Sequence, residues 1–275
     1  MVTMGEMRQR HAVDAAAHGD GDLVERREHL RQGALQRNHG IRPTARKARA
    51  RMVHAVSPAV PAEATARVRA HADRYGWALA LIDAGEFADF RYRTNPIDRC
   101  YFCKSNLYSR IAGAFAGVIL SGTNTDDLGD YRPGLKAAGE NGVRHPFVEV
   151  GMAKSDVRVV ARALGLDDVA ELPAAPCLAS RIETGIHINA ADLALADEVE
   201  RRVRAEFGAA DVRCRITAQG VRVELGSEAL ERLRSPIGGA TRAAVEEIVA
   251  GLGRAFLGYA PYRRGSAFVR NTSHD

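Results

Sequence analysis

The sequence lacks the features that would place it in or beyond a membrane. No apolar run approaches the roughly 20 residues that a membrane-spanning helix needs. The opening residues, MVTMGEMRQRHAVDAAAHGDG, place no apolar stretch after their basic positions, which argues against a secretory signal. Only four cysteines occur among 275 residues, too few for a disulfide framework. We therefore expect a cytoplasmic protein without membrane attachment, whose close cysteine pairs serve metal or redox chemistry.

The body of the chain also lacks an excess of charge. The formal net charge is +5, and residues 1–53 account for it, with 11 basic, 6 acidic and no aromatic residues. Without aromatic side chains or a sustained hydrophobic period, this segment is typical of a solvated tail and not of a nucleic-acid-binding face. We interpret residues 1–53 as a basic, poorly patterned arm and expect no nucleic acid partner.

Short apolar runs alternate with helical patterns over residues 54–184. The composition, 46% hydrophobic and 27% charged, is that of a globular protein with one large domain or two modest ones. Strands that alternate with helices favour a parallel α/β sheet, whose chemistry gathers at the carboxyl ends of its strands. The loop after Leu120 is such a position. The predicted elements are helices over 62–75, 104–116 and after an N-cap at Ser155, with strands at 78–82 and 117–120.

A second pattern begins after residue 184, and we predict a small α+β domain over 185–275. Its long helix is capped by Asn189 and ended by Gly208. The apolar face of this helix comprises Leu193, Ala196, Val199, Val203 and Phe207. The elements that follow are strands at 212–217 and 221–225, a helix through Val245 and a strand at 254–259.

Two cysteine-containing segments are open to several interpretations. The C-x-x-C pair Cys100 and Cys103 fits a zinc half-site, a redox dithiol, iron–sulfur ligands or two ordinary buried thiols. Cys177 lies in a small-residue loop, followed by Ser180 and Arg181. An electropositive setting of this kind favours a thiolate nucleophile or a metal ligand. The alternative for Cys177 is a small hydrophobe packed under a domain junction.

A polar loop over residues 121–134 is suited to bind a ligand such as a nucleotide or Mg²⁺. Gly122 permits close backbone approach, and Asn124, Asp126 and Asp127 can contact a nucleotide or coordinate Mg²⁺. The alternative is a solvated turn rich in Asn, Asp and Gly.

The strand at 212–217 has two different faces. Alternation places Cys214 with its apolar neighbours, so we predict that it belongs to the core. Arg213 and Arg215 share the other face, which we expect to be exposed. Two adjacent arginines can clamp a phosphate or a carboxylate, and the alternative is a solvated strand face.

Four segments together resemble one family. NPIDRCYFCKS, GTNTDDLGDYRPG, PCLASRI and VRCRI are similar to the LarE-type ATP-dependent sulfur transferases of the PP-loop ATP-pyrophosphatase superfamily, in the family's order. The resemblance runs from about residue 54 to 266. It implies a PP-loop, adenine nucleotide alpha hydrolase-like fold over 54–184, with a parallel sheet covered by helices on both faces. Residues 185–275 would then form a C-terminal substrate and oligomerisation domain.

The resemblance also implies a reaction and its reactants. ATP would adenylate a carboxylate of pyridinium-3,5-biscarboxylic acid mononucleotide, and sulfur would displace AMP to leave a thiocarboxylate. The product would feed the biosynthesis of the nickel-pincer nucleotide cofactor. Sulfide or another sulfur donor would supply the sulfur, and the protein would be a homo-oligomer.

The family's functional residues can be carried over to this sequence. Cys177 matches the sulfur-handling cysteine, which single-cysteine members sacrifice as dehydroalanine. In members with three matching cysteines, here Cys100, Cys103 and Cys177, these hold a [4Fe–4S] cluster. The residues implied for ATP and Mg²⁺ are Gly122, Thr123, Asn124, Asp127, Asp130 and Arg132, and those for the substrate are Ser180, Arg181, Arg213, Arg215, Glu200 and Glu224.

One departure from the family is the absence of Ser-Gly-Gly-x-Asp-Ser. In the superfamily this loop follows the first strand, and its amides hold the ATP pyrophosphate at a helix N-terminus. Residues 20–50 contain neither the loop nor an apolar strand. We interpret residues 1–53 as a mistranslated or degenerate segment, and expect impaired ATP binding if the chain is as written. The competing interpretations are a PP-loop enzyme that thiolates tRNA and a catalytically inactive remnant.

Overall fold

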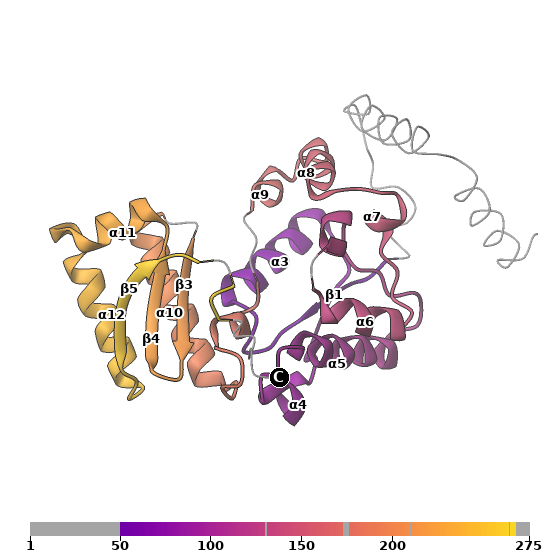
Figure 1. Ribbon diagram of the computed structural model, residues 1–275. Coiled ribbons are helices and arrows are strands. Elements are labelled where there is room, and N and C mark those ends of the chain that lie inside the picture. The colour runs from indigo at the N-terminus through magenta and orange to yellow at the C-terminus, as the bar shows by residue number, and fades with distance from the viewer. Residues whose placement is uncertain (1–49, 130, 173–175, 209–210, 264, 268–275) are drawn as a thin grey trace, which may run out of the picture. The chain divides into compact units, whose positions relative to one another are not determined.

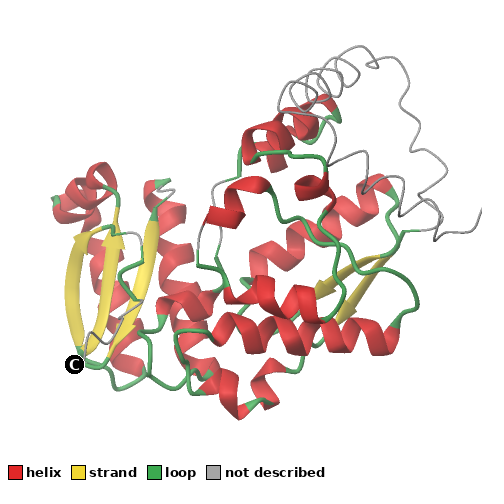
Figure 2. Ribbon diagram, turned by 45° about the vertical axis from the view of Figure 1, so that its right-hand side comes forward, coloured by secondary structure: helices red, strands yellow, loops and turns green. Residues whose placement is uncertain are grey.

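The structure is a computed structural model that describes residues 50–129, 131–172, 176–208, 211–263 and 265–267. These residues form a mixed α/β protein with a two-stranded and a three-stranded sheet among many helices (Figure 1 and Figure 2). They divide into two compact units whose segments interleave along the chain. So far as they are described, Val118–Arg132 and Val143–Leu172 belong to the smaller unit, and Ala48–Gly117, Pro133–Gly142 and Pro173–Asp275 belong to the larger unit.

The larger unit begins with a parallel pair of short strands. β1 (Met52–Ala55) pairs with β2 (Leu79–Ile82), and α3 (Ala62–Tyr75) connects them as a crossover helix. Gly76 ends α3 in the left-handed conformation, with a φ of 60°. The predicted helix over 62–75 and the strand near residues 78–82 are therefore confirmed.

Helix α5 carries the C-x-x-C pair and begins earlier than the sequence predicted. It spans Arg99–Ala114, so Cys100 and Cys103 lie in its first turns and not in a preceding loop. Helix α6 (Pro133–Glu140) packs along it at Gly134, where a Cβ would lie only 3.0 Å from the Lys104 Cγ. The short helices η1 (Glu86–Ala88) and α4 (Phe90–Arg93) precede α5.

The smaller unit is built from short helices, and two predictions about it were wrong. The apolar run at 117–120 forms a single parallel bridge, from Leu120 to Arg144, instead of a strand. Ser155 lies inside its helix, and Ala153 occupies the N-cap position, where its N–H donates to the Asp156 carboxylate at 3.0 Å. The helices are η2 (Thr125–Gly129), α7 (Pro146–Glu149), α8 (Lys154–Ala163) and α9 (Asp167–Ala170).

A three-stranded sheet with helices completes the larger unit. β3 (Val212–Thr217) pairs antiparallel with β4 (Gly220–Leu225), and β4 pairs in parallel with β5 (Phe256–Pro261). The two predicted strands and their short turn are confirmed. The helices are η3 (Leu178–Arg181), α10 (Ala190–Phe207), α11 (Ser227–Arg234), η4 (Pro236–Gly238) and α12 (Gly239–Gly251), of which α11 was not predicted.

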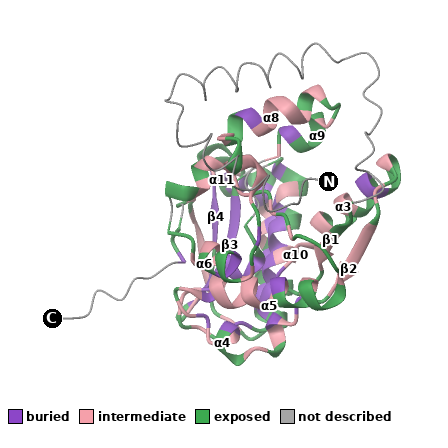
Figure 3. Ribbon diagram, turned by 90° about the vertical axis from the view of Figure 1, so that its right-hand side faces the viewer, coloured by how far each residue is buried: buried purple, intermediate pink, exposed green. Residues whose placement is uncertain are grey.

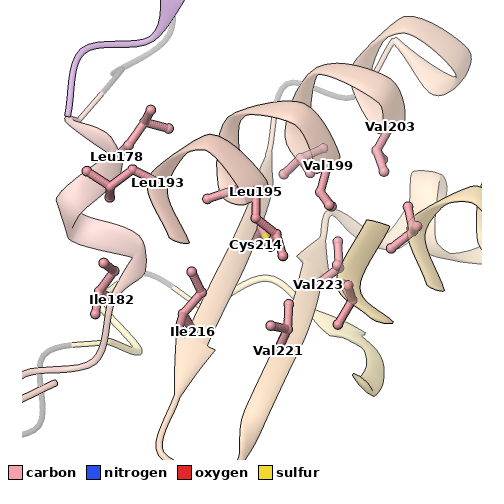
Figure 4. Close-up of a cluster of buried hydrophobic side chains, with 14 of the residues drawn as sticks. Leu178, Ile182, Leu193, Leu195, Val199, Val203, Cys214, Ile216, Val221 and Val223 are labelled. Carbon is pink, nitrogen blue, oxygen red and sulfur yellow. The ribbon is translucent and has the colours of Figure 1, made fainter. Parts of the chain in front are cut away.

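The main hydrophobic core lies between α10 and this sheet (Figure 3 and Figure 4). Asn189 caps α10 by accepting the Asp192 N–H at 2.8 Å, and Gly208 ends the helix, as predicted. The predicted apolar face of α10 is buried, and Cys214 is buried among the same side chains. Each large aliphatic side chain buried in this way stabilises the fold by about 1.5–3 kcal/mol. The core therefore fixes β3, and with it the arginines on its other face.

The described residues include helices of up to 18 residues. No helix there has both the length and the apolarity needed to cross a bilayer.

Candidate functional site

Three cysteines from two segments come together in the larger unit. Cys100 and Cys103 are one turn apart on α5, and the exposed Cys177 directly precedes η3. Burial raises the pKa of the Cys103 thiol to about 12, and the neighbouring Cys177 makes the next largest contribution. Cys100 acts in the same direction. The thiols are therefore near enough to influence one another's charge, although Cys177 is more than 70 residues from the pair.

These thiols have the chemistry of soft-metal ligands but not the arrangement of a site for one ion. Three thiolates suit iron–sulfur ligation, because iron–sulfur clusters are held by cysteine sulfur. Within the part of the chain that the structure describes, no group of three His, Cys, Asp or Glu side chains is placed to hold a single metal ion. The donor set thus fits a cluster chemically, while its geometry does not define one.

Two buried polar side chains lie near the thiols, and sequence reasoning missed both. Tyr92 and Glu86 are each 2% exposed, and the Tyr92 hydroxyl and Glu86 Oε2 have no hydrogen-bond partner among the described residues. Burial raises the pKa of Tyr92 above its usual range, and the nearby Cys177 and Cys103 add to the effect. Tyr92 therefore remains a protonated donor. Neither residue stands in a recognisable motif, so the sequence offered no signal for them.

Arg181 fastens the segment that carries Cys177. Its Nη1 donates to the carbonyls of Pro176 at 2.7 Å and Cys177 at 3.1 Å, and to Ser180 Oγ at 3.0 Å. Its Nε and Nη2 donate to Glu200 at 2.8 and 2.7 Å. Burial alone lowers the pKa of Arg181, but the hydrogen bonds and charge of Glu200 outweigh burial and raise it. The guanidinium thus holds the Cys177 backbone against α10.

Glu200 joins three elements through its two oxygens. Oε1 accepts hydrogen bonds from Arg181 and from the Cys214 N–H of β3, the latter at 2.9 Å. Oε2 accepts hydrogen bonds from Arg181 and Arg204 at 2.7 Å each. The carboxylate is fully buried. In this arrangement Glu200 acts on the site by orienting Arg181.

The two arginines of β3 are buried, which corrects the expectation of an exposed face. Arg213 and Arg215 are only 7% and 6% exposed. Arg215 donates to Glu224 at 2.9 Å and to the Ser180 carbonyl at 3.1 Å, so the segment after Cys177 covers it. Arg213 lies 5.5 Å from the Tyr262 ring centre. The covering segments are distant in sequence, and strand periodicity could not reveal them.

The electrostatics of this face favour an anion. Burial lowers the pKa of Arg213, and the positive charge of Arg181 lowers it further. Glu224, the partner of Arg215, also accepts the Ser266 hydroxyl at 2.9 Å. Three buried arginines thus lie in one region with two buried glutamates, Glu200 and Glu224, and guanidinium groups are well suited to bind an anionic group.

The residues predicted to bind nucleotide lie in the smaller unit. Asp127 accepts the Asn124 N–H at 3.1 Å and pairs with Arg132 at 2.8 Å, which folds the loop on itself. Asp126 accepts the Lys154 N–H at 3.1 Å at the start of α8. Asp130 lies outside the described residues.

A small polar group adjoins Gly122 and Thr123 in the same unit. Ser121 Oγ lies 2.9 Å from Thr123 Oγ1 and 2.8 Å from His145 Nδ1. A Cβ on Gly122 would meet only the Phe147 ring, at 4.0 Å, so a ligand can approach its backbone. The sequence did not single out His145, because it lies on a separate segment of the unit.

Comparison with known proteins gives three relatives. The chain is 36% identical over 184 residues to the uncharacterized protein slr1717 of Synechocystis, covering 66% of this chain and 68% of that protein. It is 32% identical over 142 residues to pyridinium-3,5-bisthiocarboxylic acid mononucleotide synthase of Lactiplantibacillus plantarum, covering 50% and 51%. It is 32% identical over 114 residues to the uncharacterized protein MJ0830 of Methanocaldococcus jannaschii, covering 40% and 44%. No protein-family model matches the chain.

Proposed function

The chain belongs to the family of Synechocystis slr1717, and on that premise we propose that it is an ATP-dependent sulfurtransferase. Its substrate would be pyridinium-3,5-biscarboxylic acid mononucleotide, in the biosynthesis of the nickel-pincer nucleotide cofactor. The similarity to a synthase named for the corresponding bisthiocarboxylic acid supports this assignment. That similarity spans about half of each protein. We therefore propose the PP-loop fold and the complete reaction together with the substrate.

The observation that carries the proposal is the position of Cys177. It is an exposed thiol beside a second thiol, Cys103, and its backbone is fixed by Arg181. The buried arginines Arg213 and Arg215 lie on the adjoining strand. A nucleophilic sulfur next to fixed cations suits a reaction in which an anionic substrate presents an activated acyl group.

The chemistry would proceed in two steps. A substrate carboxylate attacks the α-phosphorus of ATP, releasing pyrophosphate and forming an acyl adenylate, because a free carboxylate is a poor electrophile. Sulfur then attacks the acyl carbon and AMP leaves with the bonding electron pair. The loop with Gly122, Thr123, Asn124, Asp127 and Arg132 would hold ATP and Mg²⁺.

Substrate binding would fall to the larger unit. Arg213 and Arg215 would contact the substrate phosphate or second carboxylate, assisted by Ser180 and Arg181. Glu200 would orient Arg181, and Glu224 would orient Arg215, because each carboxylate already accepts a hydrogen bond from that guanidinium.

The source of the sulfur has two forms that differ at Cys177. If Cys177 itself attacks, a thioester forms, and loss of its Cα proton with cleavage of the Cβ–S bond leaves a thiocarboxylate and dehydroalanine. Alternatively, Cys100, Cys103 and Cys177 would hold a [4Fe–4S] cluster, whose fourth iron would be open to sulfide. Anaerobic reconstitution decides between them. A visible absorption that Cys100→Ala abolishes supports the cluster, and a mass loss of H₂S at Cys177 after turnover supports sacrifice.

The decisive experiment measures both steps on the full chain. We expect AMP release and a thiocarboxylate product when ATP, Mg²⁺ and the pyridinium substrate are supplied. Cys177→Ala is expected to abolish the product while AMP is still released by hydrolysis of the adenylate. Cys214→Ala is the matched control, because this buried thiol faces the core and should leave sulfur transfer intact. Absence of AMP release would overturn the proposal.

One observation favours a second candidate, an inactive relative. The sequence contains no Ser-Gly-Gly-x-Asp-Ser loop, on which pyrophosphate binding depends in the superfamily. An inactive chain would bind neither ATP nor its analogues, and equilibrium dialysis with labelled ATP tests this directly. Filter binding to tRNA tests the third interpretation, thiolation of tRNA.

A further inference from the structure

Asn95 has an unusual backbone for its position. Its φ is 55°, and it is the single non-glycine residue with a positive φ in the described part of the chain. It is also fully buried, with 0% of its surface exposed. Asparagine tolerates this conformation better than most residues, but the conformation persists only where surrounding contacts impose it. The contacts of Asn95 therefore indicate what the conformation serves.

The side chain of Asn95 bonds to two segments at once. Its Nδ2 donates to the Glu183 carbonyl at 2.8 Å and to the Ile182 carbonyl at 3.4 Å. Its Oδ1 accepts Nη1 of Arg99 at 2.9 Å, and Arg99 is almost fully buried. The main chain repeats the link, because the Asn95 carbonyl accepts the Gly185 N–H at 2.9 Å. One amide thus connects the start of α5 with the segment that leaves η3.

Both ends of this connection lead directly to the thiols. Arg99 is the first residue of α5 and precedes Cys100. Ile182 is the residue that ends η3, a single short helix after Cys177. A second main-chain bond, from the Ile188 N–H to the Arg93 carbonyl at 2.8 Å, runs between the same two segments.

We propose that Asn95 and Arg99 are positioning residues that hold the C-x-x-C turn of α5 in register with the Cys177 segment. The role rests on the proposed function only for the use made of the thiols. Asn95 meets two requirements that other residues meet singly: it adopts a positive φ, and it donates to two carbonyls while accepting from a guanidinium. Glycine keeps only the backbone conformation, and aspartate keeps the conformation and the acceptor but loses the donors.

The test measures thiol convergence directly on the full chain, without ATP or substrate. Reduced protein is treated with dibromobimane, a short bifunctional reagent that fluoresces strongly once both ends have reacted with thiols. Peptide mass spectrometry then identifies the cross-linked pair. In the natural chain we expect a cross-link between Cys177 and Cys103 or Cys100. A natural chain that forms no cross-link to Cys177 would overturn the proposal.

Two variants at Asn95 separate positioning from folding. Asn95→Asp and Asn95→Gly should each form the cross-link at least about fivefold more slowly, since each loses the donors that reach Ile182 and Glu183. Single-ended labelling of Cys177 with monobromobimane should stay within about twofold of the natural chain, because Cys177 is exposed in any case. If Asn95→Asp does not fold, Asn95→Gly decides. A cross-linking rate equal to that of the natural chain in a folded Asn95 variant overturns the proposal.

A matched control removes a comparable asparagine elsewhere in the larger unit. Asn189→Ala loses the N-cap of α10 but leaves the hydrogen bonds from Asn95 to the Ile182 and Glu183 carbonyls in place. It should cross-link at the natural rate. A decrease as large as that of the Asn95 variants would show that general loosening explains the effect and would overturn the positioning role. Absence of AMP release, by contrast, bears on the proposed function and leaves this result unchanged.

Discussion

Arg181 and Glu200 meet in a two-bond ion pair of 2.8 and 2.7 Å, with both side chains almost completely removed from water. The pair joins the segment of Cys177 to α10, and Glu200 extends the link to β3 through the Cys214 N–H. A buried charge is stable only while its partner remains, because water cannot replace it. The thiol segment therefore depends on a residue that no substrate need touch.

Replacing one partner of this pair should be costly. Glu200→Gln leaves the Arg181 charge buried without its counter-ion, and we expect the free energy of unfolding to fall by about 3 kcal/mol. Urea denaturation followed by circular dichroism measures the change. Glu198→Gln is the control on the same helix, because its pair with Arg201 is exposed and should contribute less than about 0.5 kcal/mol. Equal losses in the two variants would contradict the importance of the buried pair.

The folded protein should be more stable when Tyr92 lacks its hydroxyl. The hydroxyl is buried without a partner, so Tyr92→Phe is expected to raise the free energy of unfolding by about 1 kcal/mol. Thermal and urea unfolding measure this gain. Tyr101→Phe should have the opposite sign, because the Tyr101 hydroxyl donates to Glu140 at 2.7 Å. If Tyr92→Phe is stabilised yet loses sulfur transfer, the hydroxyl serves the reaction. A destabilised Tyr92→Phe would mean that the hydroxyl has a partner in the folded protein.

The thiols should react at different rates with iodoacetamide. At pH 8 we expect Cys177 to react well before Cys103, because Cys177 is exposed and burial raises the pKa of Cys103 to about 12. The Cys103 rate should rise about tenfold for each pH unit between 8 and 10, since the thiolate fraction rises in that proportion below the pKa. Peptide mass spectrometry at timed intervals gives each rate.

The same shift sets the direction of a stability change. The folded pKa of Cys103 lies above the ordinary value of 9.0, so the unfolded chain loses this proton first as the pH rises. The contribution of Cys103 to stability is therefore complete below about pH 9 and decreases between pH 9 and 12. Cys103→Ala should remove this part of the alkaline loss. An iodoacetamide rate at Cys103 equal to that at Cys177 at pH 8 would contradict the raised pKa of Cys103, on which both predictions depend.

Two adjacent glycines should respond oppositely to alanine. A Cβ at Gly238 would lie 2.0 Å from the Leu233 carbonyl oxygen, so Gly238→Ala is expected to lower the free energy of unfolding by about 3 kcal/mol. At Gly239, within α12, a Cβ meets no atom within 4 Å. Gly239→Ala should therefore be neutral or stabilising by up to about 1 kcal/mol. Chemical denaturation of both variants checks the contrast, and equal effects would contradict it.

The sequence predicted best where one helix or strand supplies its own signals. Asn189, Gly208 and the apolar residues between them define α10 without reference to other segments. Alternation along β3 likewise identified Cys214 as a core residue. The strand expected at 117–120 had no such support, since its apolar residues are also compatible with the exposed single bridge at Leu120.

The site was less predictable because distant segments complete it. Arg213 and Arg215 were expected to be exposed, since alternation places them opposite the core but says nothing of the residues near 180 and 262 that cover them. Tyr92 and Glu86 belong to no motif and become notable only once their burial is known. Asn95 stands in the quoted NPIDRC segment, but its positive φ is a property of the folded backbone.

The interleaving of the two units has a consequence for dissection of the protein. The chain passes from one unit to the other after Gly117, Arg132, Gly142 and Leu172. Any single cut within 118–172 would divide both units between the resulting fragments, and no uninterrupted stretch of the gene encodes the larger unit alone. Expression of fragments would thus separate the thiol pair on α5 from Cys177. Work on this chemistry has to use the uncut polypeptide, and a nicked preparation should be judged by whether its pieces stay together.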